Sequence, residues 1–157
     1  MATVSQAIIV DITVVTGWCF AEAAGSYVDA ALTEVALHGG LVPPCWMTEV
    51  ANVLLAAETR MRLTEADSTR FLTLLQELPL RVDNTLPSRH WGDVVGQARR
   101  HGLNSAEGAY LELALRENAR LASLNQRLRQ AARDCHVRLF TEGERNRGGG
   151  NEDEISR

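Results

Sequence analysis

Residues 7–20 read AIIVDITVVTGWCF, and this stretch decides the fold. Its first half is a short β-branched run that ends at Asp11, which is typical of a buried strand. The residues after Asp11 change to a helix-like pattern. Asp11 is thereby placed at a point where it either caps the helix that follows or meets a cation, since burying an unpaired carboxylate is costly.

The rest of the chain repeats this alternation of strand and helix. Further strands are predicted near residues 41–44, 80–84, 120–124 and 136–140, and helices at 26–40, 45–60, 64–78, 89–102, 104–118 and 126–135. Strands separated by one or two helices favour parallel pairing, with helices on both faces of the sheet. In such sheets ligands bind at the carboxyl ends of the strands, near a switch point in strand order.

Composition narrows the class of protein. The 157 residues fit one domain, and the polar, glycine-rich residues 141–157 are expected to be a disordered tail after a domain of residues 1–140. No apolar run approaches the ~18 residues of a membrane span and the N-terminus lacks a basic signal start, so we expect a cytoplasmic protein without membrane contact. The three widely spaced cysteines are expected to be reduced.

All 16 basic residues are arginines, which excludes mechanisms that need a lysine. Arginine suits bidentate contact with phosphate, and the pairs Arg60/Arg62, Arg99/Arg100 and Arg127/Arg129 are candidates for a nucleic-acid backbone. The net charge of −4 argues against an indiscriminate nucleic-acid binder.

Four polar residues are candidates for a functional site, because helix capping does not explain all of them. Asp11, Glu107 and Asn125 each lie where a helix begins, and each has a capping explanation. Glu49 shares a helical face with Trp46 and its apolar neighbours, where a solvent-facing charge is not expected. Because strand ends and helix starts gather at one edge of a parallel sheet, all four are expected to converge in one cleft.

A cluster of carboxylates needs protons or hard cations to neutralise it. Mg²⁺ and Mn²⁺ prefer oxygen ligands, activate water and stabilise phosphoryl transition states, so this cluster favours metal-assisted phosphodiester hydrolysis. His38, His90, His101 and His136 are scattered along the chain, and no His or Cys cluster supports zinc.

These blocks resemble a PIN domain, and more narrowly the VapC-type toxins of bacterial toxin–antitoxin pairs. The resemblance covers about residues 7–140 and depends on the order and spacing of IIVDITVVTGWCF, LVPPCWMTEVANVLLAAETRMRLTEAD, WGDVVGQARRHGLNSAEGAYLELALREN and RLASLNQRLRQAAR. It implies a three-layer α/β/α sandwich around a parallel sheet of about four to five strands. It also implies a Mg²⁺- or Mn²⁺-dependent endoribonuclease that forms a homodimer and is inhibited by a small antitoxin.

Carried over position by position, the family's first three acids fall on Asp11, Glu49 and Glu107, which are expected to hold the metal. Thr13 matches a small hydroxyl residue beside the first acid, and the fourth acidic position falls on Asn125. Thr13 and Asn125 are expected to orient a ligand or a water molecule.

The chain departs from the family pattern at two of these positions. Glu107 is one methylene longer than the usual Asp, and Asn125 removes a negative charge. The alternative reading is therefore a degenerate PIN module that binds RNA or an antitoxin without catalysis. An aspartate-nucleophile phosphatase is excluded, because the second Asp and the lysine of that chemistry are missing.

Overall fold

The fold is a four-stranded parallel sheet with helices on both sides, as predicted. The computed structural model describes residues 7–85 and 87–143. Its strands are β1 (Ile8–Val10), β2 (Gly40–Val42), β3 (Leu80–Val82) and β4 (Arg120–Ala122), in the spatial order β3-β2-β1-β4. The helices are α1 (Ile12–Cys19), the 3₁₀ helix η1 (Ala21–Ala23), α2 (Ser26–His38), α3 (Cys45–Thr59), α4 (Glu65–Glu77), α5 (Pro87–His101), α6 (Ser105–Glu117) and α7 (Gln126–Asp134).

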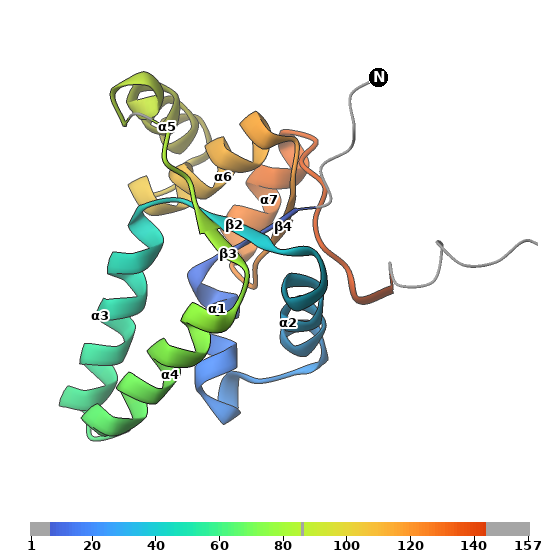
Figure 1. The fold of residues 1–157 in the computed structure, drawn as a ribbon. Coiled ribbons are helices and arrows are strands. Elements are labelled where there is room, and N and C mark those ends of the chain that lie inside the picture. The colour runs from blue at the N-terminus through green and yellow to red at the C-terminus, as the bar shows by residue number, and fades with distance from the viewer. Residues whose placement is uncertain (1–6, 86, 144–157) are drawn as a thin grey trace, which may run out of the picture.

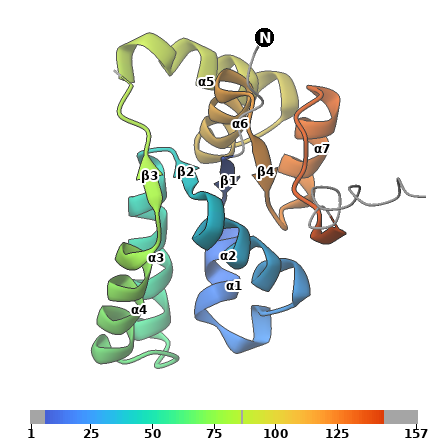
Figure 2. The same ribbon diagram turned by 45° about the vertical axis from the view of Figure 1, so that its right-hand side comes forward.

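The helices form the two outer layers of an α/β/α sandwich. In both ribbon views α5, α6 and α7 lie on one side of the strands, and α1 to α4 lie on the other (Figures 1 and 2). β2 lies on one side of β1 and β3 lies beyond β2, whereas β4 lies on the other side of β1. The strand order therefore switches direction between β1 and β4.

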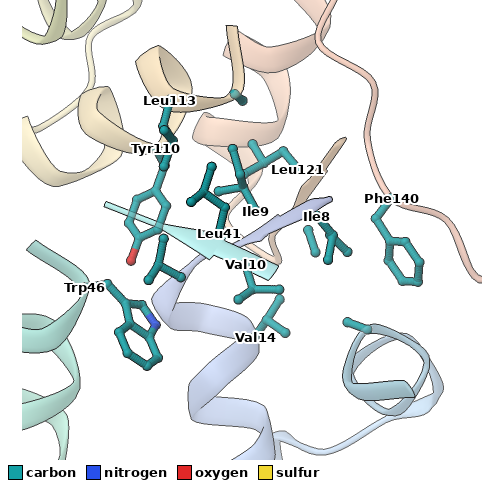
Figure 3. Close-up of a cluster of buried hydrophobic side chains, with 14 of the residues drawn as sticks. Ile8, Ile9, Val10, Val14, Leu41, Trp46, Tyr110, Leu113, Leu121 and Phe140 are labelled. Atoms are coloured by element: carbon teal, nitrogen blue, oxygen red, sulfur yellow. The ribbon is translucent and has the colours of Figure 1, made fainter. Parts of the chain in front are cut away.

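The two central strands are buried on both faces, which is why their sequences read as continuous apolar runs. All three residues of β1 have no exposed surface, and Val10 pairs with Ala122 of β4. Figure 3 shows Tyr110 and Leu113 of α6 on one side of these strands, with Val14 and Trp46 on the other. Strand and helix packing together fix where the last residue of β1, and hence Asp11, lies.

Helix starts agree with the capping signals in the sequence. Asp11 caps α1 and Asn125 caps α7 through their side-chain oxygens. Complete capping boxes join Thr64 to Asp67 at α4 and Asn104 to Glu107 at α6. Each satisfies backbone donors that a helix N-terminus would otherwise leave unpaired.

The predicted strand at residues 136–140 is wrong as a regular strand. His136 adopts a left-handed backbone conformation with φ 59°, and only an isolated parallel bridge joins Leu139 to Leu121. Two hydrogen bonds around that bridge, from Leu121 N to Arg138 O and from Phe140 N to Leu121 O, are both 2.9 Å long. The left-handed conformation at the first residue of the segment departs from strand geometry, and one bridge is formed beside β4.

Two other expectations lie partly beyond the described chain. Residues 144–157 of the expected disordered tail lie outside the described residues, while Glu142 accepts a hydrogen bond from Ser26 Oγ at 3.0 Å. Across residues 7–85 and 87–143, the helices are all too short or too polar to cross a bilayer.

Close packing of α5 against α6 depends on Gly108. A Cβ atom at this position would lie 2.9 Å from the backbone oxygen of Val94 and 3.0 Å from the Cβ of Ala98. We predict that Gly108→Ala lowers the free energy of unfolding by about 1–3 kcal/mol, because the backbone of α5 would have to move. Urea denaturation measures this change.

Gly96 of α5 provides the matched control, since an added Cβ there would have no atom within 4 Å. Gly96→Ala is expected to stabilise the protein by up to about 1 kcal/mol through helix propensity alone. Equal effects of the two substitutions would contradict the close approach of α5 and α6.

Candidate active site

Asp11 lies at the switch point of the sheet, where the sequence placed it. It follows β1 directly, and its backbone N–H donates to the carbonyl of Ala122 in β4 at 3.1 Å. Its side chain is 2% exposed and accepts hydrogen bonds from the backbone N–H groups of Thr13 at 3.0 Å and Val14 at 3.3 Å. The carboxylate therefore caps α1 and occupies the ligand-binding position of an α/β sheet at the same time.

Ser123 ties Asp11 to the start of α7. Its hydroxyl donates to Oδ2 of Asp11 and accepts from the backbone N–H of Asn125 at 3.0 Å. Thr13 makes a second tie, because its hydroxyl donates to Oδ1 of Asp11 and accepts from the backbone N–H of Leu124 at 2.8 Å. Both hydroxyl groups thus fix the loop after β4 against the loop after β1.

Glu107 and Asn125 meet across the same edge of the sheet. The side-chain Nδ2 of Asn125 donates to Oε1 of Glu107 at 2.8 Å, while Oδ1 of Asn125 caps α7. The other Glu107 oxygen, Oε2, accepts from the backbone N–H of Asn104 at 2.9 Å. An aspartate at position 125 would face Glu107 with like charge, so the amide permits this contact.

Glu49 approaches from α3 and is half-buried. The hydroxyl of Tyr110 donates to its Oε1 at 2.8 Å. Tyr110 is 1% exposed and lies one turn beyond Glu107 on α6, with its hydroxyl end directed away from that helix (Figure 3). This hydrogen bond joins α3 to α6 at the site and directs the carboxylate of Glu49 toward α6.

The acidic groups lie close enough to influence one another electrostatically. Burial raises the pKa of Asp11 above its ordinary value, against the lowering effect of its hydrogen bonds to Ser123 and Thr13. Burial also raises the pKa of Glu49, and the negative charges of Asp11 and Glu107 raise it further. Two neighbouring carboxylates with raised pKa values are a feature of functional sites, and they favour neutralisation by protons or cations. We call Asp11, Glu49, Glu107 and Asn125 the acidic cluster.

The ligand atoms of the acidic cluster lie farther apart than those of a site already closed around one ion. Within residues 7–85 and 87–143, one other group of residues brings three metal-ligand atoms within 4.8 Å of one another, and the acidic cluster does not. The capping box and the amide of Asn125 engage both oxygens of Glu107, which accounts for part of this separation. Binding of one ion by all three acids would require Glu107 to give up at least one of these partners.

The predicted phosphate-binding arginines differ in their surroundings. Arg127 is 61% exposed on its side chain and lies beside the cluster, with Nη2 3.3 Å from Oε1 of Glu107. Arg129 instead donates to the carbonyl of Ser123 at 2.9 Å and packs over the ring of Tyr27. Arg62 forms an ion pair with Glu22. Of these, Arg127 is the arginine placed to meet an anion at the site.

Two residues of the site were not identified from the sequence. Ser123 is fully buried next to Asp11, and its signal is its place directly after a strand that pairs with β1. Tyr110 holds Glu49, and its signal is its place three residues after Glu107, on the same helical face. Both act through acidic residues that the sequence did single out.

Comparisons with known proteins show the fold alone. No protein-family model matches the chain, and no curated protein matches it by sequence. A solved structure, the crystal structure of PAE2754 from Pyrobaculum aerophilum, is similar with a TM-score of 0.60 at 17% sequence identity. The match covers 80% of this chain and 85% of that one. The chain therefore adopts an α/β fold that is also found in an archaeal protein.

Proposed function

We propose that this protein is a divalent-metal-dependent ribonuclease of the VapC type within the PIN family. The observation that carries the proposal is the acidic cluster, in which residues from four distant segments meet at the switch point of a parallel sheet. The pKa values of the Asp11 and Glu49 carboxyl groups are raised there, so the site favours a positive counterion. The resemblance of residues 7–140 to VapC-type toxins supplies the class of reaction.

The donor set fits Mg²⁺ or Mn²⁺. Asp11, Glu49 and Glu107 offer carboxylate oxygens, and these hard cations prefer oxygen ligands. Such an ion supplies charge stabilisation at a phosphoryl group and lowers the pKa of water. These three residues would hold it, and Asn125 would contribute a neutral amide beside it.

The other residues of the site bind and orient. Tyr110 holds the carboxylate of Glu49 in place, while Ser123 and Thr13 hold that of Asp11. The exposed guanidinium group of Arg127 is placed to contact a phosphate of the RNA backbone next to the acids. Hydrolysis of an internal phosphodiester bond is the reaction that this arrangement favours.

Glu49→Gln tests the proposal, with Glu58→Gln on the same helix as a matched control. The first substitution removes a carboxylate held in the site, and the second removes one that lies nine residues farther along α3, which places it on the opposite face of the helix. Incubation of structured RNA with Mn²⁺ is expected to give cleavage that falls at least about a hundredfold in Glu49→Gln and persists in Glu58→Gln. Equal cleavage by all three proteins would assign the activity to a contaminant.

The second candidate function is that of a degenerate PIN module. It is favoured by the hydrogen bonds that already occupy the carboxylate of Glu107. Both of its oxygens are held by Asn104 and Asn125, and Arg127 adds a positive charge that competes with a cation. Such a module binds RNA or an antitoxin without hydrolysis. Titration calorimetry with Mn²⁺ distinguishes the two, because the degenerate module shows no saturable binding.

The resemblance extends the proposal to partners. We propose a homodimer that a cognate antitoxin protein inhibits, with RNA as the substrate, in the cytoplasm. Size-exclusion chromatography with light scattering tests the dimer directly.

A further inference from the structure

A second group of metal-ligating side chains lies between α5 and α6, away from the acidic cluster. His90 and Asp93 stand one turn apart on α5, and Glu112 faces them from α6. The Nδ1 atom of His90 lies 3.5 Å from Oε1 of Glu112 and 3.7 Å from Oδ2 of Asp93. One ligand atom from each residue lies within 4.8 Å of the others.

These separations are longer than ordinary hydrogen bonds and match those of ligands that share an ion. Nitrogen and oxygen ligands lie 2.0–2.2 Å from Zn²⁺ in a tetrahedral site, which places them roughly 3.4 Å from one another. A histidine nitrogen with two carboxylates is a donor set that suits Zn²⁺ and similar divalent transition metals better than Mg²⁺. Sequence spacing did not reveal the group because Glu112 comes from a different helix.

An orphaned polar atom gives independent support. Gln97 lies one turn beyond Asp93 on α5 and lines the same surface cavity of about 320 Å³ as His90, Asp93 and Glu112. Its Oε1 atom is buried and makes no hydrogen bond within the described part of the chain. Buried polar atoms in native proteins usually have a partner, and this carbonyl oxygen gains one if the Gln97 side chain turns toward an ion in the cavity.

The group is held by a rigid contact. Close approach at Gly108 fixes α6 against α5, and Glu112 lies one turn farther along α6. Arg116 competes with a cation for the carboxylate of Glu112, since its Nε donates to Oε1 of Glu112 at 2.8 Å. Arg116 also donates to Asp83 at 2.7 Å and to Thr85 at 3.1 Å, so it keeps partners when Glu112 turns toward a cation.

We propose that His90, Asp93 and Glu112 bind a divalent transition metal ion of the Zn²⁺ class, with Gln97 as a further oxygen donor. The ion joins the first half of α5 to the middle of α6, and so serves a structural role separate from the acidic cluster.

Titration of the full chain with Zn²⁺ alone, by calorimetry and by thermal unfolding, tests this site. Wild type is expected to show saturable binding and a raised Tm. His90→Ala is expected to weaken binding at least about tenfold. Asp93→Asn is expected to weaken it too, and because the Asp93 side chain is 69% exposed, this variant keeps the fold even if His90→Ala does not.

Two controls complete the experiment. His38→Ala removes an exposed histidine at the end of α2, and Asp29→Asn removes an exposed carboxylate from the same helix. Both are expected to bind Zn²⁺ as wild type does. The proposal is overturned if wild type shows no saturable binding, if Asp93→Asn and His90→Ala bind as wild type does, or if only a substitution in the acidic cluster, Asp11→Asn, removes the binding.

Discussion

Asp11→Asn is expected to abolish stabilisation of this protein by Mn²⁺ while leaving the fold intact. An amide oxygen at position 11 still accepts the hydrogen bonds from the backbone N–H groups of Thr13 and Val14, so the cap of α1 is kept. The charge that attracts a cation is lost. At a Mn²⁺ concentration 100 times Kd, wild type gains about 2.7 kcal/mol of unfolding free energy, and the variant gains almost none.

The same substitution is expected to reduce RNA cleavage at least about a hundredfold. Thermal unfolding with Mn²⁺ and with a chelator measures the stabilisation, and circular dichroism checks that the variant is folded. Asp29→Asn, on an exposed position of α2, is the matched control. Mn²⁺ stabilisation that is equal in wild type and Asp11→Asn would place the ion outside the acidic cluster.

The raised pKa of Asp11 gives this prediction a pH dependence whose sign is fixed. Between the ordinary value of 3.8 and the raised value, the folded protein binds more protons at Asp11 than the unfolded chain does. Stability without metal therefore falls as pH rises through that window, and it stays lower above it. Asp11→Asn removes this contribution, so the difference in unfolding free energy between the two proteins changes across the same window.

Metal binding follows the opposite trend. A cation requires deprotonated carboxylates, so stabilisation of wild type by Mn²⁺ is expected to increase as pH rises through the raised pKa values of Asp11 and Glu49. Unfolding curves at several pH values, each with and without Mn²⁺, measure both trends. A Mn²⁺ effect that does not depend on pH would contradict carboxylate ligands with raised pKa values.

Local signals in the sequence predicted the fold well because they agree with the tertiary structure. The run ending at Asp11 forms a fully buried strand, and the capping box at Asn104 and Glu107 starts α6 as expected. The segment at 136–140 failed for a local reason, since its apolar residues do not reveal the left-handed conformation of His136. Strand propensity alone does not decide whether a peripheral segment forms a full ladder.

The candidate site was predicted only in outline. Strand ends and helix starts placed Asp11, Glu107 and Asn125 at one edge of the sheet, but their mutual hydrogen bonds depend on side-chain directions that a sequence does not contain. Ser123 and Tyr110 look like ordinary core residues until β4 is placed beside β1 and α6 beside α3. Partners that come from separate elements are visible only once those elements are packed.

Asn125→Asp is expected to make the protein less stable without metal and more responsive to metal. The substitution replaces the 2.8 Å hydrogen bond between Nδ2 of residue 125 and Oε1 of Glu107 with a pair of facing carboxylates. Loss of a hydrogen bond to a charged group costs about 1.5–3 kcal/mol, and like-charge repulsion adds to that. A free energy of unfolding measured in chelator should therefore fall by about 2 kcal/mol or more.

The cation response should change in the opposite direction, because repulsion between residues 107 and 125 is relieved when an ion binds between them. We expect Asn125→Asp to bind Mn²⁺ at least about tenfold more tightly than wild type, since a fourth hard oxygen donor joins the site. Asn84→Asp beyond β3, the far edge strand of the sheet, adds the same charge as a control and should leave Mn²⁺ affinity unchanged.

Calorimetry on these three proteins also separates the two candidate functions. Binding of Mn²⁺ by wild type, strengthened in Asn125→Asp, supports a ribonuclease that works with three carboxylates. Binding by Asn125→Asp alone supports the degenerate module, in which the amide at position 125 keeps Glu107 in its capping role. A variant as stable as wild type in chelator would contradict a stabilising contact between Asn125 and Glu107, because the facing carboxylates would then cost nothing relative to the hydrogen bond.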